Sequence, residues 1–180
     1  MRASEGHRFL VRLRHAFHHP VAEKASTPHR VVVYVTGGPD DQRLLEAVEK
    51  IAQRQHTYIT ITYVVEVQQS IPLDAELPGE IDRGEAVLRD AEVAVSKFVR
   101  GKRENVRTEL LQARSAGAAI VDEAIENGAN AIMLSCSIRK RHGRAGVGDT
   151  VQYVLQNAPS EVIVIRQALP SWIPDEGARP

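Results

Sequence analysis

The sequence predicts a single α/β domain with a five-stranded, mostly parallel sheet, doubly wound with helices in a Rossmann-like arrangement. Short runs rich in β-branched residues alternate along the chain with longer segments of helical periodicity. The β-branched runs are nearly continuous, which is typical of parallel strands buried on both faces. The length of 180 residues suits one domain with a full hydrophobic core.

The first two strands and the helix between them follow this pattern. Residues 30–36 (RVVVYVT) and 58–67 (YITITYVVEV) are predicted strands. Residues 37–39 (GGP) form the turn after the first strand, and Asp40 or Asp41 caps the helix that follows. That helix is predicted from apolar residues at helical spacing: Leu44, Leu45, Val48, Ile51 and Ala52.

The middle of the chain continues the alternation. A loop containing Pro72 and Pro78 leads into a long helix, and residues 106–111 (VRTELL) alternate as in an edge or half-exposed strand. Residues 118–127 form a further helix, closed by Gly128 as a typical residue just after a helix end. The long helix carries one apolar stripe: Leu88, Ala91, Val95 and Phe98.

The last part of the chain supplies two more strands. Residues 131–134 are the fourth predicted strand and residues 162–165 (VIVI) the fifth. Between them lie a basic, glycine-containing loop over 137–148 (SIRKRHGRAGVG) and a helix over 150–157. Ligands of parallel α/β sheets bind beyond the carboxyl ends of the strands. We therefore expect any small-molecule site at one rim, formed by the loops after the first, second and fourth strands.

The two ends differ from the domain over 30–166. Residues 1–29 form a basic extension and linker, and residues 167–180 a proline-containing tail. Within the extension, apolar residues at helical spacing before Pro20 predict a helix: Phe9, Leu10, Leu13, Ala16 and Phe17.

Composition excludes several classes of protein. Lys plus Arg and Asp plus Glu both number 23, so the basic excess of a nucleic-acid-binding protein is missing. With Cys136 as the single cysteine, one chain forms no disulfide and no cysteine-based zinc cluster. Arginines interrupt the apolar residues at the start of the chain, which does not fit a signal peptide. We expect a cytoplasmic protein.

Residues 148–166 (GDTVQYVLQNAPSEVIVIR) resemble the ending of the universal stress protein family: glycine, short helix, an alanine-proline pair and a final hydrophobic strand. The opening strand, the TYVVEV segment and the long second helix agree with the same family. The resemblance covers residues 30–166. It implies the adenine nucleotide α-hydrolase-like form of the Rossmann-like fold.

The resemblance also identifies the positions of a nucleotide site. Family members that bind ATP carry two glycines separated by two residues, then nine residues, then glycine and a hydroxyl residue. Here the two early glycines correspond to Ser135 and Ile138, and the hydroxyl residue to Asp149. Gly148 is retained, as is Val64 in the adenine-contacting strand end, whereas Thr36 replaces the usual aspartate. The resemblance implies these binding positions: Thr36, Gly37, Val64, Ser135, Ile138, Arg139, Gly148, Asp149 and Thr150.

These departures predict that ATP binding is weak or lost. Glycines in such a loop let the backbone approach phosphates closely, and Ile138 adds a β-branched side chain instead. A carboxylate at Asp149 competes for the helix N-terminus and repels phosphate. On the other side, Thr150 supplies a displaced hydroxyl, and four cations make the loop basic: Arg139, Lys140, Arg141 and Arg144.

Three weaker signals have simpler explanations. Residues 36–41 (TGGPDD) resemble the glycine-glycine loop of ATP pyrophosphatases, but a strand-to-helix turn needs the same residue types. Cys136 follows the fourth strand, where a reactive thiol or a small buried residue are both open. Three histidines lie at spacings that share a helical face, which more often gives a polar helix face than a metal site: His15, His18 and His19.

These features predict a non-enzymatic regulatory domain that acts through dimerisation and partner contacts. By resemblance, the fifth strand pairs with its counterpart in a homodimer, through Val162, Ile163, Val164 and Ile165. One alternative is an ATP- or AMP-binding stress switch. Another is a regulatory domain of a transporter, peripheral to the inner face of the membrane, in which residues 1–20 contact the membrane surface or a protein partner.

Overall fold

A six-stranded sheet lies between two pairs of helices in a computed structural model that describes residues 11–13, 29–54, 57–97, 105–136, 139–141 and 144–166. The strand order is β1-β4-β3-β2-β5-β8, and the five strands from β4 to β8 run parallel. The strands are β1 (Val11–Leu13), β2 (His29–Tyr34), β3 (Thr57–Glu66), β4 (Val106–Ala113), β5 (Ala131–Cys136) and β8 (Glu161–Arg166).

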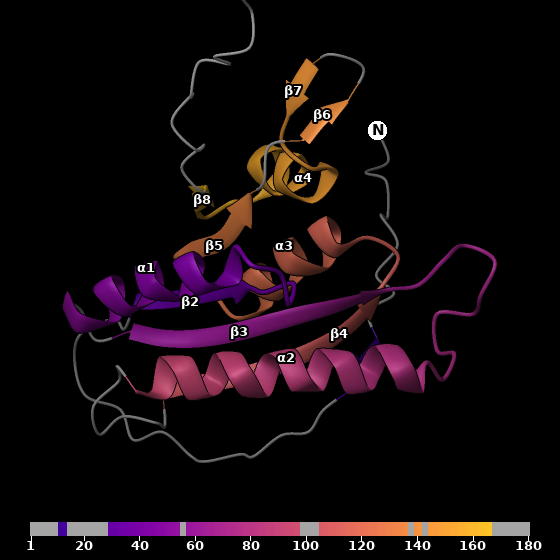
Figure 1. The fold of residues 1–180 in the computed structure, drawn as a ribbon, viewed down its shortest axis with the longest axis horizontal. Coiled ribbons are helices and arrows are strands. Elements are labelled where there is room, and N and C mark those ends of the chain that lie inside the picture. The colour runs from indigo at the N-terminus through magenta and orange to yellow at the C-terminus, as the bar shows by residue number, and fades with distance from the viewer. Residues whose placement is uncertain are drawn as a thin grey trace, which may run out of the picture.

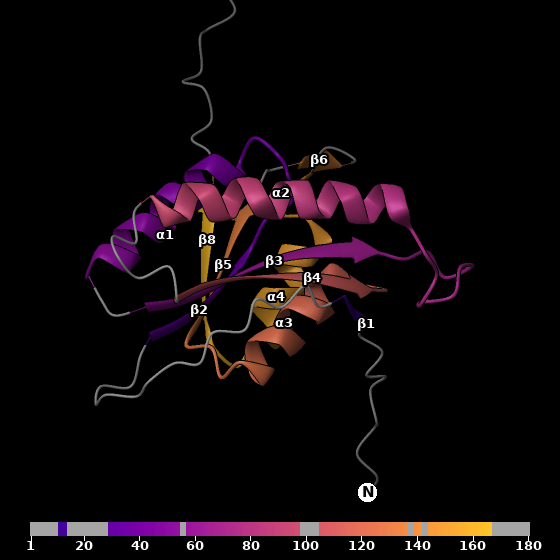
Figure 2. The ribbon, with the colours of Figure 1, turned by 90° about the horizontal axis from the view of Figure 1, so that it is seen from below.

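Two helices cover each face of the sheet (Figure 2). Helices α1 (Asp41–Arg54) and α2 (Pro78–Ser96) lie on one face, and α3 (Ala116–Glu126) and α4 (Asp149–Asn157) on the other. Each pair closes its own hydrophobic cluster against the sheet. The predicted α/β fold with a five-stranded parallel sheet is therefore confirmed.

Alternation along β2 explains why its β-branched run is almost continuous. Val31 and Val33 pack into the cluster under α1 and α2, while Val32 packs into the cluster under α3 and α4. All three are buried, because successive side chains of a strand point to opposite faces and both faces are covered. The apolar stripes predicted for α1 and α2 also lie in the core, apart from Phe98, which lies outside the described residues. Their buried members are Leu44, Leu45, Val48, Leu88, Ala91 and Val95.

The structure corrects the prediction of an N-terminal helix. Val11–Leu13 forms strand β1, which pairs antiparallel with β4 and makes the sheet six-stranded rather than five-stranded. The apolar spacing over 9–17 fits a helix. The outer edge of β4, however, supplies hydrogen-bond partners to the backbone of an extended segment equally well. The other residues of 1–28, including the three histidines, and the tail from 167 lie outside the described residues.

The basic segment after β5 is also more regular than the predicted loop. It contains an antiparallel two-stranded ribbon, β6 (Arg139–Arg141) and β7 (Arg144–Gly146), which Figure 1 shows projecting beyond α4. Pro78, expected in a loop, is the first residue of α2. Proline suits that position because the first helical residue needs no amide donor. None of the described helices is long and apolar enough to cross a membrane.

Candidate functional site

The rim at the carboxyl ends of β2, β3 and β5 brings together most of the candidate positions. Tyr34 is aligned with Thr62 of β3 and with Leu134 of β5. The chain therefore continues from β2 into Thr36 and Gly37 at the level where β3 reaches Val64 and β5 reaches Cys136. In a parallel α/β sheet, ligands bind at this rim, beyond the carboxyl ends of the strands.

The turn after β2 is closed by a carboxylate of the chain itself. Asp41 is 8% exposed, and its Oδ2 accepts the backbone amides of Thr36 at 2.8 Å and Gly37 at 2.6 Å. The hydroxyl of Thr36 donates to the second oxygen, Oδ1, at 3.2 Å. The sequence predicts that Asp40 or Asp41 caps α1, which begins at Asp41. The carboxylate of Asp41 serves the preceding turn instead.

This arrangement bears on the resemblance to the pyrophosphatase loop. Such a loop binds an anion with its free backbone amides. Here the amides of Thr36 and Gly37 already donate to Asp41, and the amide of Gly38 donates to the hydroxyl of Thr36 at 3.2 Å. The three amides therefore have partners within the turn, which supports the simpler reading as a strand-to-helix connection.

A second carboxylate occupies the N-terminus of α3. Glu66, the last residue of β3, accepts the backbone amide of Ala116 at 2.7 Å. The helix is capped further by Ser115, whose hydroxyl accepts the amide of Ala118 at 3.5 Å. Carboxylates at helix N-termini stabilise the free amides and the positive end of the helix dipole. The amides of Ala116 and Ala118 thus have partners from within the chain.

The phenol of Tyr34 is influenced by both carboxylates. Burial is the largest cause that raises the pKa of its phenol far above the usual value. The charges of Glu66 and Asp41 add to this effect, together with Tyr63. The two carboxylates thus disfavour a further negative charge at this phenol.

The remaining strand-end positions are mostly buried. Val64 is 6% exposed and packs in the cluster under α3 and α4. Cys136 belongs to the same cluster and is buried, in agreement with the reading of a small core residue. Ser135 is half-buried, and Ile138 lies outside the described residues.

The N-terminus of α4 has no side-chain cap. Gly148 is its N-cap residue, with φ −63° and ψ 159°, so α4 begins without a side-chain cap. A Cβ added at Gly148 would meet nothing within 4 Å. Asp149 is exposed and Thr150 half-buried in the first turn of the helix. Arg139 begins the neighbouring strand β6.

The residues present fit an adenine nucleotide poorly. Where phosphates would need free amides, the β2–α1 turn and the start of α3 are occupied by Asp41 and Glu66. The uncapped start of α4 carries Asp149 in place of a hydroxyl residue. The backbone amides of Thr36, Gly37 and Ala116 at this rim therefore already donate to carboxylates of the chain itself.

Sequence reasoning missed the residues that hold the loop between β3 and α2 against the end of β4. The Gln112 amide nitrogen donates to the carbonyl oxygens of Leu73 at 2.7 Å and Ala75 at 2.9 Å. Arg114 donates to the carbonyl of Val67 at 3.3 Å. A polar glutamine between Leu111 and Ala113, late in an apolar strand, was the available signal.

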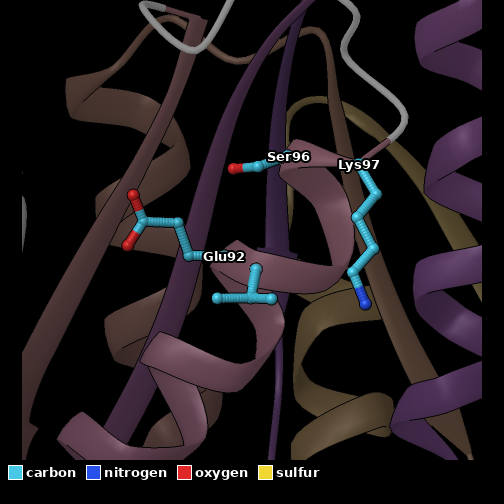
Figure 3. A pocket seen from close by; sticks show the side chains of 4 residues that line it. Glu92, Ser96 and Lys97 are labelled. Carbon is cyan, nitrogen blue, oxygen red and sulfur yellow. The ribbon is translucent and has the colours of Figure 1, made fainter.

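A shallow hollow elsewhere on the surface is unrelated to this rim. It lies at the C-terminal end of α2, lined by Glu92, Val93, Ser96 and Lys97 (Figure 3). The end of α2 lies beside the amino ends of the parallel strands, opposite the rim (Figure 1). None of the predicted site positions therefore lines the hollow. Within the described ranges, no group of three histidine, cysteine or acidic residues is placed to hold a metal ion.

Comparison with known proteins gives a consistent result. A family model described as the universal stress protein family matches residues 28–166. A universal stress protein structure from Archaeoglobus fulgidus has a TM-score of 0.64 at 20% identity, covering 77% of this chain and 98% of its own. UspA from Lactobacillus plantarum has a TM-score of 0.62 at 23% identity, covering 79% and 100%.

A further structure of the universal stress protein from Archaeoglobus fulgidus is in complex with dAMP. It has a TM-score of 0.58 at 20% identity and covers 76% of this chain and 96% of its own. At these identities the structural likeness shows the fold alone. Comparison with curated protein sequences gives no significant match.

Proposed function

Because this chain belongs to the universal stress protein family, we propose that it is a regulatory domain that works by pairing through its β8 edge and by contacting a partner. Turnover of a nucleotide is not part of this proposal. The main support for a role without nucleotide turnover is the rim. There the carboxylates of Asp41 and Glu66 accept backbone amides that an anionic ligand would need.

The β8 edge supports the pairing. Among the described strands, β8 is hydrogen-bonded on one side only, to β5. An open strand edge has unpaired N–H and C=O groups that another copy of the same strand satisfies across a two-fold axis. The side chains of Val162, Ile163, Val164 and Ile165 are half-buried rather than exposed polar groups. On α4, which contacts β8, Leu155 is 53% exposed.

Light scattering across the micromolar range tests the pairing. We expect the native protein to have the mass of two chains, and Val164→Lys to have the mass of one, since a lysine on an edge strand opposes edge pairing. Val93→Lys is the matched control, because Val93 is exposed on α2, away from β8, and should leave the mass at two chains. A native mass of one chain throughout the range would contradict the pairing.

A second candidate is a switch that binds an adenine nucleotide. The relative in complex with dAMP favours it, as does the uncapped N-terminus of α4 beside the basic ribbon. Binding would then depend on α4 and the ribbon rather than on the β2–α1 turn. The two candidates differ in one measurable property, the affinity for AMP and ATP.

The third possibility, a contact of residues 1–20 with a membrane surface or a protein partner, stays a prediction. Only Val11–Leu13 of this segment is described, and it forms a strand rather than the amphipathic helix that such a contact would use.

A further inference from the structure

A fully buried carboxylate lies at the end of α3 that is away from the rim. Glu123, in the last turn of this helix, has 0% of its side chain exposed, whereas the other buried residues of α3 are small or apolar. A buried carboxylate costs free energy unless it is paired and hydrogen-bonded. The contacts of Glu123 therefore decide whether this end of α3 packs on the sheet.

Arg107 supplies a positive charge to this carboxylate. Its Nη2 lies 3.7 Å from Oε1 of Glu123, and its own side chain is 51% exposed. Asn127 connects the two groups, because its amide nitrogen donates to the Glu123 carboxylate and its amide oxygen accepts from Nη2 of Arg107. Nε of Arg107 donates to the hydroxyl of Thr60 at 3.0 Å, which orients the guanidinium.

These four residues come from three elements of the fold. Thr60 and Arg107 are aligned with each other in the neighbouring strands β3 and β4. Glu123 belongs to α3, and Asn127 is the C-cap residue of that helix. The chain turns directly afterwards at Gly128, with φ +57°. The network therefore joins the last turn of α3 to two strands of the sheet.

Burial makes the two charges unequal partners. Without Arg107, the Glu123 carboxylate would lose this positive charge while it is shielded from water. Without Glu123, the half-exposed guanidinium would stay hydrated. Removing one partner of a buried ion pair is strongly destabilising, whereas replacing both partners is often neutral. The carboxylate reaches water if the last turn opens, and a helix end opens at lower free energy than a core.

We propose that Arg107 and Glu123 form a conformational latch. The last turn of α3 stays packed while Arg107 contacts Glu123, and the buried carboxylate opens this turn when the arginine is removed. The rest of the domain keeps its fold in the open state. Because Arg107 is half exposed, the group that controls the latch lies at the protein surface.

Amide hydrogen exchange of the full chain, followed by NMR, tests the latch with Arg107→Met. The amides of Asn127 and Ala129 report on the last turn of α3, because they donate to its carbonyl groups at 3.1 and 2.8 Å. The amide of Val35, which donates to a carbonyl of β3 at 3.0 Å, reports on the core. We expect the first two amides to exchange at least about tenfold faster than in the native protein, and Val35 to change less. Unchanged exchange at the last turn would overturn the proposal.

The variant Arg107→Met/Glu123→Gln identifies the buried charge as the cause of opening. Glutamine keeps the shape of the side chain and removes its charge, so we expect exchange at the last turn to return to within about threefold of the native rate. Glu123→Gln alone should behave in the same way. If the double variant exchanges as fast as Arg107→Met, the opening has another cause and the proposal fails.

Arg89→Met is the matched control for the loss of an arginine. It breaks an ion pair with Glu85, 3.6 Å long, in which the side chains are 66% and 35% exposed, so it leaves no fully buried carboxylate behind. We expect it to leave exchange at the last turn of α3 unchanged. Equal acceleration by Arg89→Met and Arg107→Met would contradict the latch.

The double variant also decides the outcome if Arg107→Met does not fold. A folded Arg107→Met/Glu123→Gln would then show that the unpaired buried charge prevents folding, as the latch requires. An unfolded double variant would overturn the proposal, because the loss of Arg107 would then act independently of the Glu123 charge.

Discussion

Gly37 donates its backbone amide to the carboxylate of Asp41 at 2.6 Å, four residues further along the chain. The same oxygen accepts the amide of Thr36, so one buried carboxylate closes the turn at the end of β2. This contact fixes the shape of the turn, and it occupies two backbone amides at the rim.

Replacing Asp41 should destabilise the domain. Hydrogen bonds to a charged group contribute more than neutral ones, and Asp41→Ala leaves two amides and a hydroxyl without their acceptor. We expect a loss of about 2 kcal/mol in the free energy of unfolding, measured with urea. Glu46→Ala, at an exposed carboxylate of the same helix, should change it by less than about 0.5 kcal/mol. A loss no larger than that of the control would show that Asp41 does not hold the turn.

Gly37 should resist substitution for two reasons. Its φ is +76°, and a Cβ would lie 2.7 Å from Cγ2 of Val87, a β-branched side chain that cannot turn aside easily. Gly128 has φ +57° but open space around its Cβ position, so Gly128→Ala measures the backbone cost alone. We expect Gly128→Ala to cost about 1 kcal/mol in unfolding free energy and Gly37→Ala at least about 1 kcal/mol more. Equal costs would show that Val87 moves away freely.

Two neighbouring threonines of β3 should respond in opposite directions to the same change. The hydroxyl of Thr62 is fully buried and has no hydrogen-bond partner among the described residues. Thr62→Val should therefore stabilise the fold by about 1 kcal/mol. The hydroxyl of Thr60 accepts Nε of Arg107 at 3.0 Å, so Thr60→Val should cost about 1 kcal/mol. Urea unfolding of both variants checks the pair, and a destabilised Thr62→Val would indicate a partner for that hydroxyl.

Tyr34 should make the fold sensitive to alkali. Burial, followed by the charge of Glu66, raises the pKa of its phenol in the folded protein. Above about pH 10 the unfolded chain loses this proton while the folded chain keeps it, so stability falls as the pH rises. The slope from this group approaches about 1.4 kcal/mol per pH unit. Tyr34→Phe should show a smaller fall in unfolding free energy between pH 8 and pH 11 than the native protein. Identical falls would contradict this account.

The fold was predictable because its signals are local. The β-branched run of β2 reflects burial on both faces, and Gly128 ends α3 in the left-handed conformation that favours glycine. Strand β1 was not predictable, because Val11–Leu13 is extended only through pairing with β4, about 100 residues away. The ribbon of β6 and β7 is a local hairpin in which Arg139 pairs with Gly146, and its basic residues lack the β-branched signal of the other strands.

The positions of the candidate site were predictable, but its contacts were not. A parallel sheet brings Thr36 and Val64 to one rim whatever their side chains do. The direction of the Asp41 carboxylate depends on the geometry of a turn with φ +76° at Gly37. The role of Glu66 depends on α3 beginning beside the end of β3. A single sequence contains neither relationship.

Calorimetric titration with ATP and AMP tests most directly the claim that the chain's own carboxylates leave the rim without a nucleotide site. The native protein is compared with Asp149→Ser, which restores a hydroxyl residue at the start of α4. We expect no heat of binding from the native protein at micromolar nucleotide, and detectable binding by Asp149→Ser if α4 is the part of the rim that remains open. Micromolar binding by the native protein would contradict the claim, and would make the nucleotide switch the function of this domain.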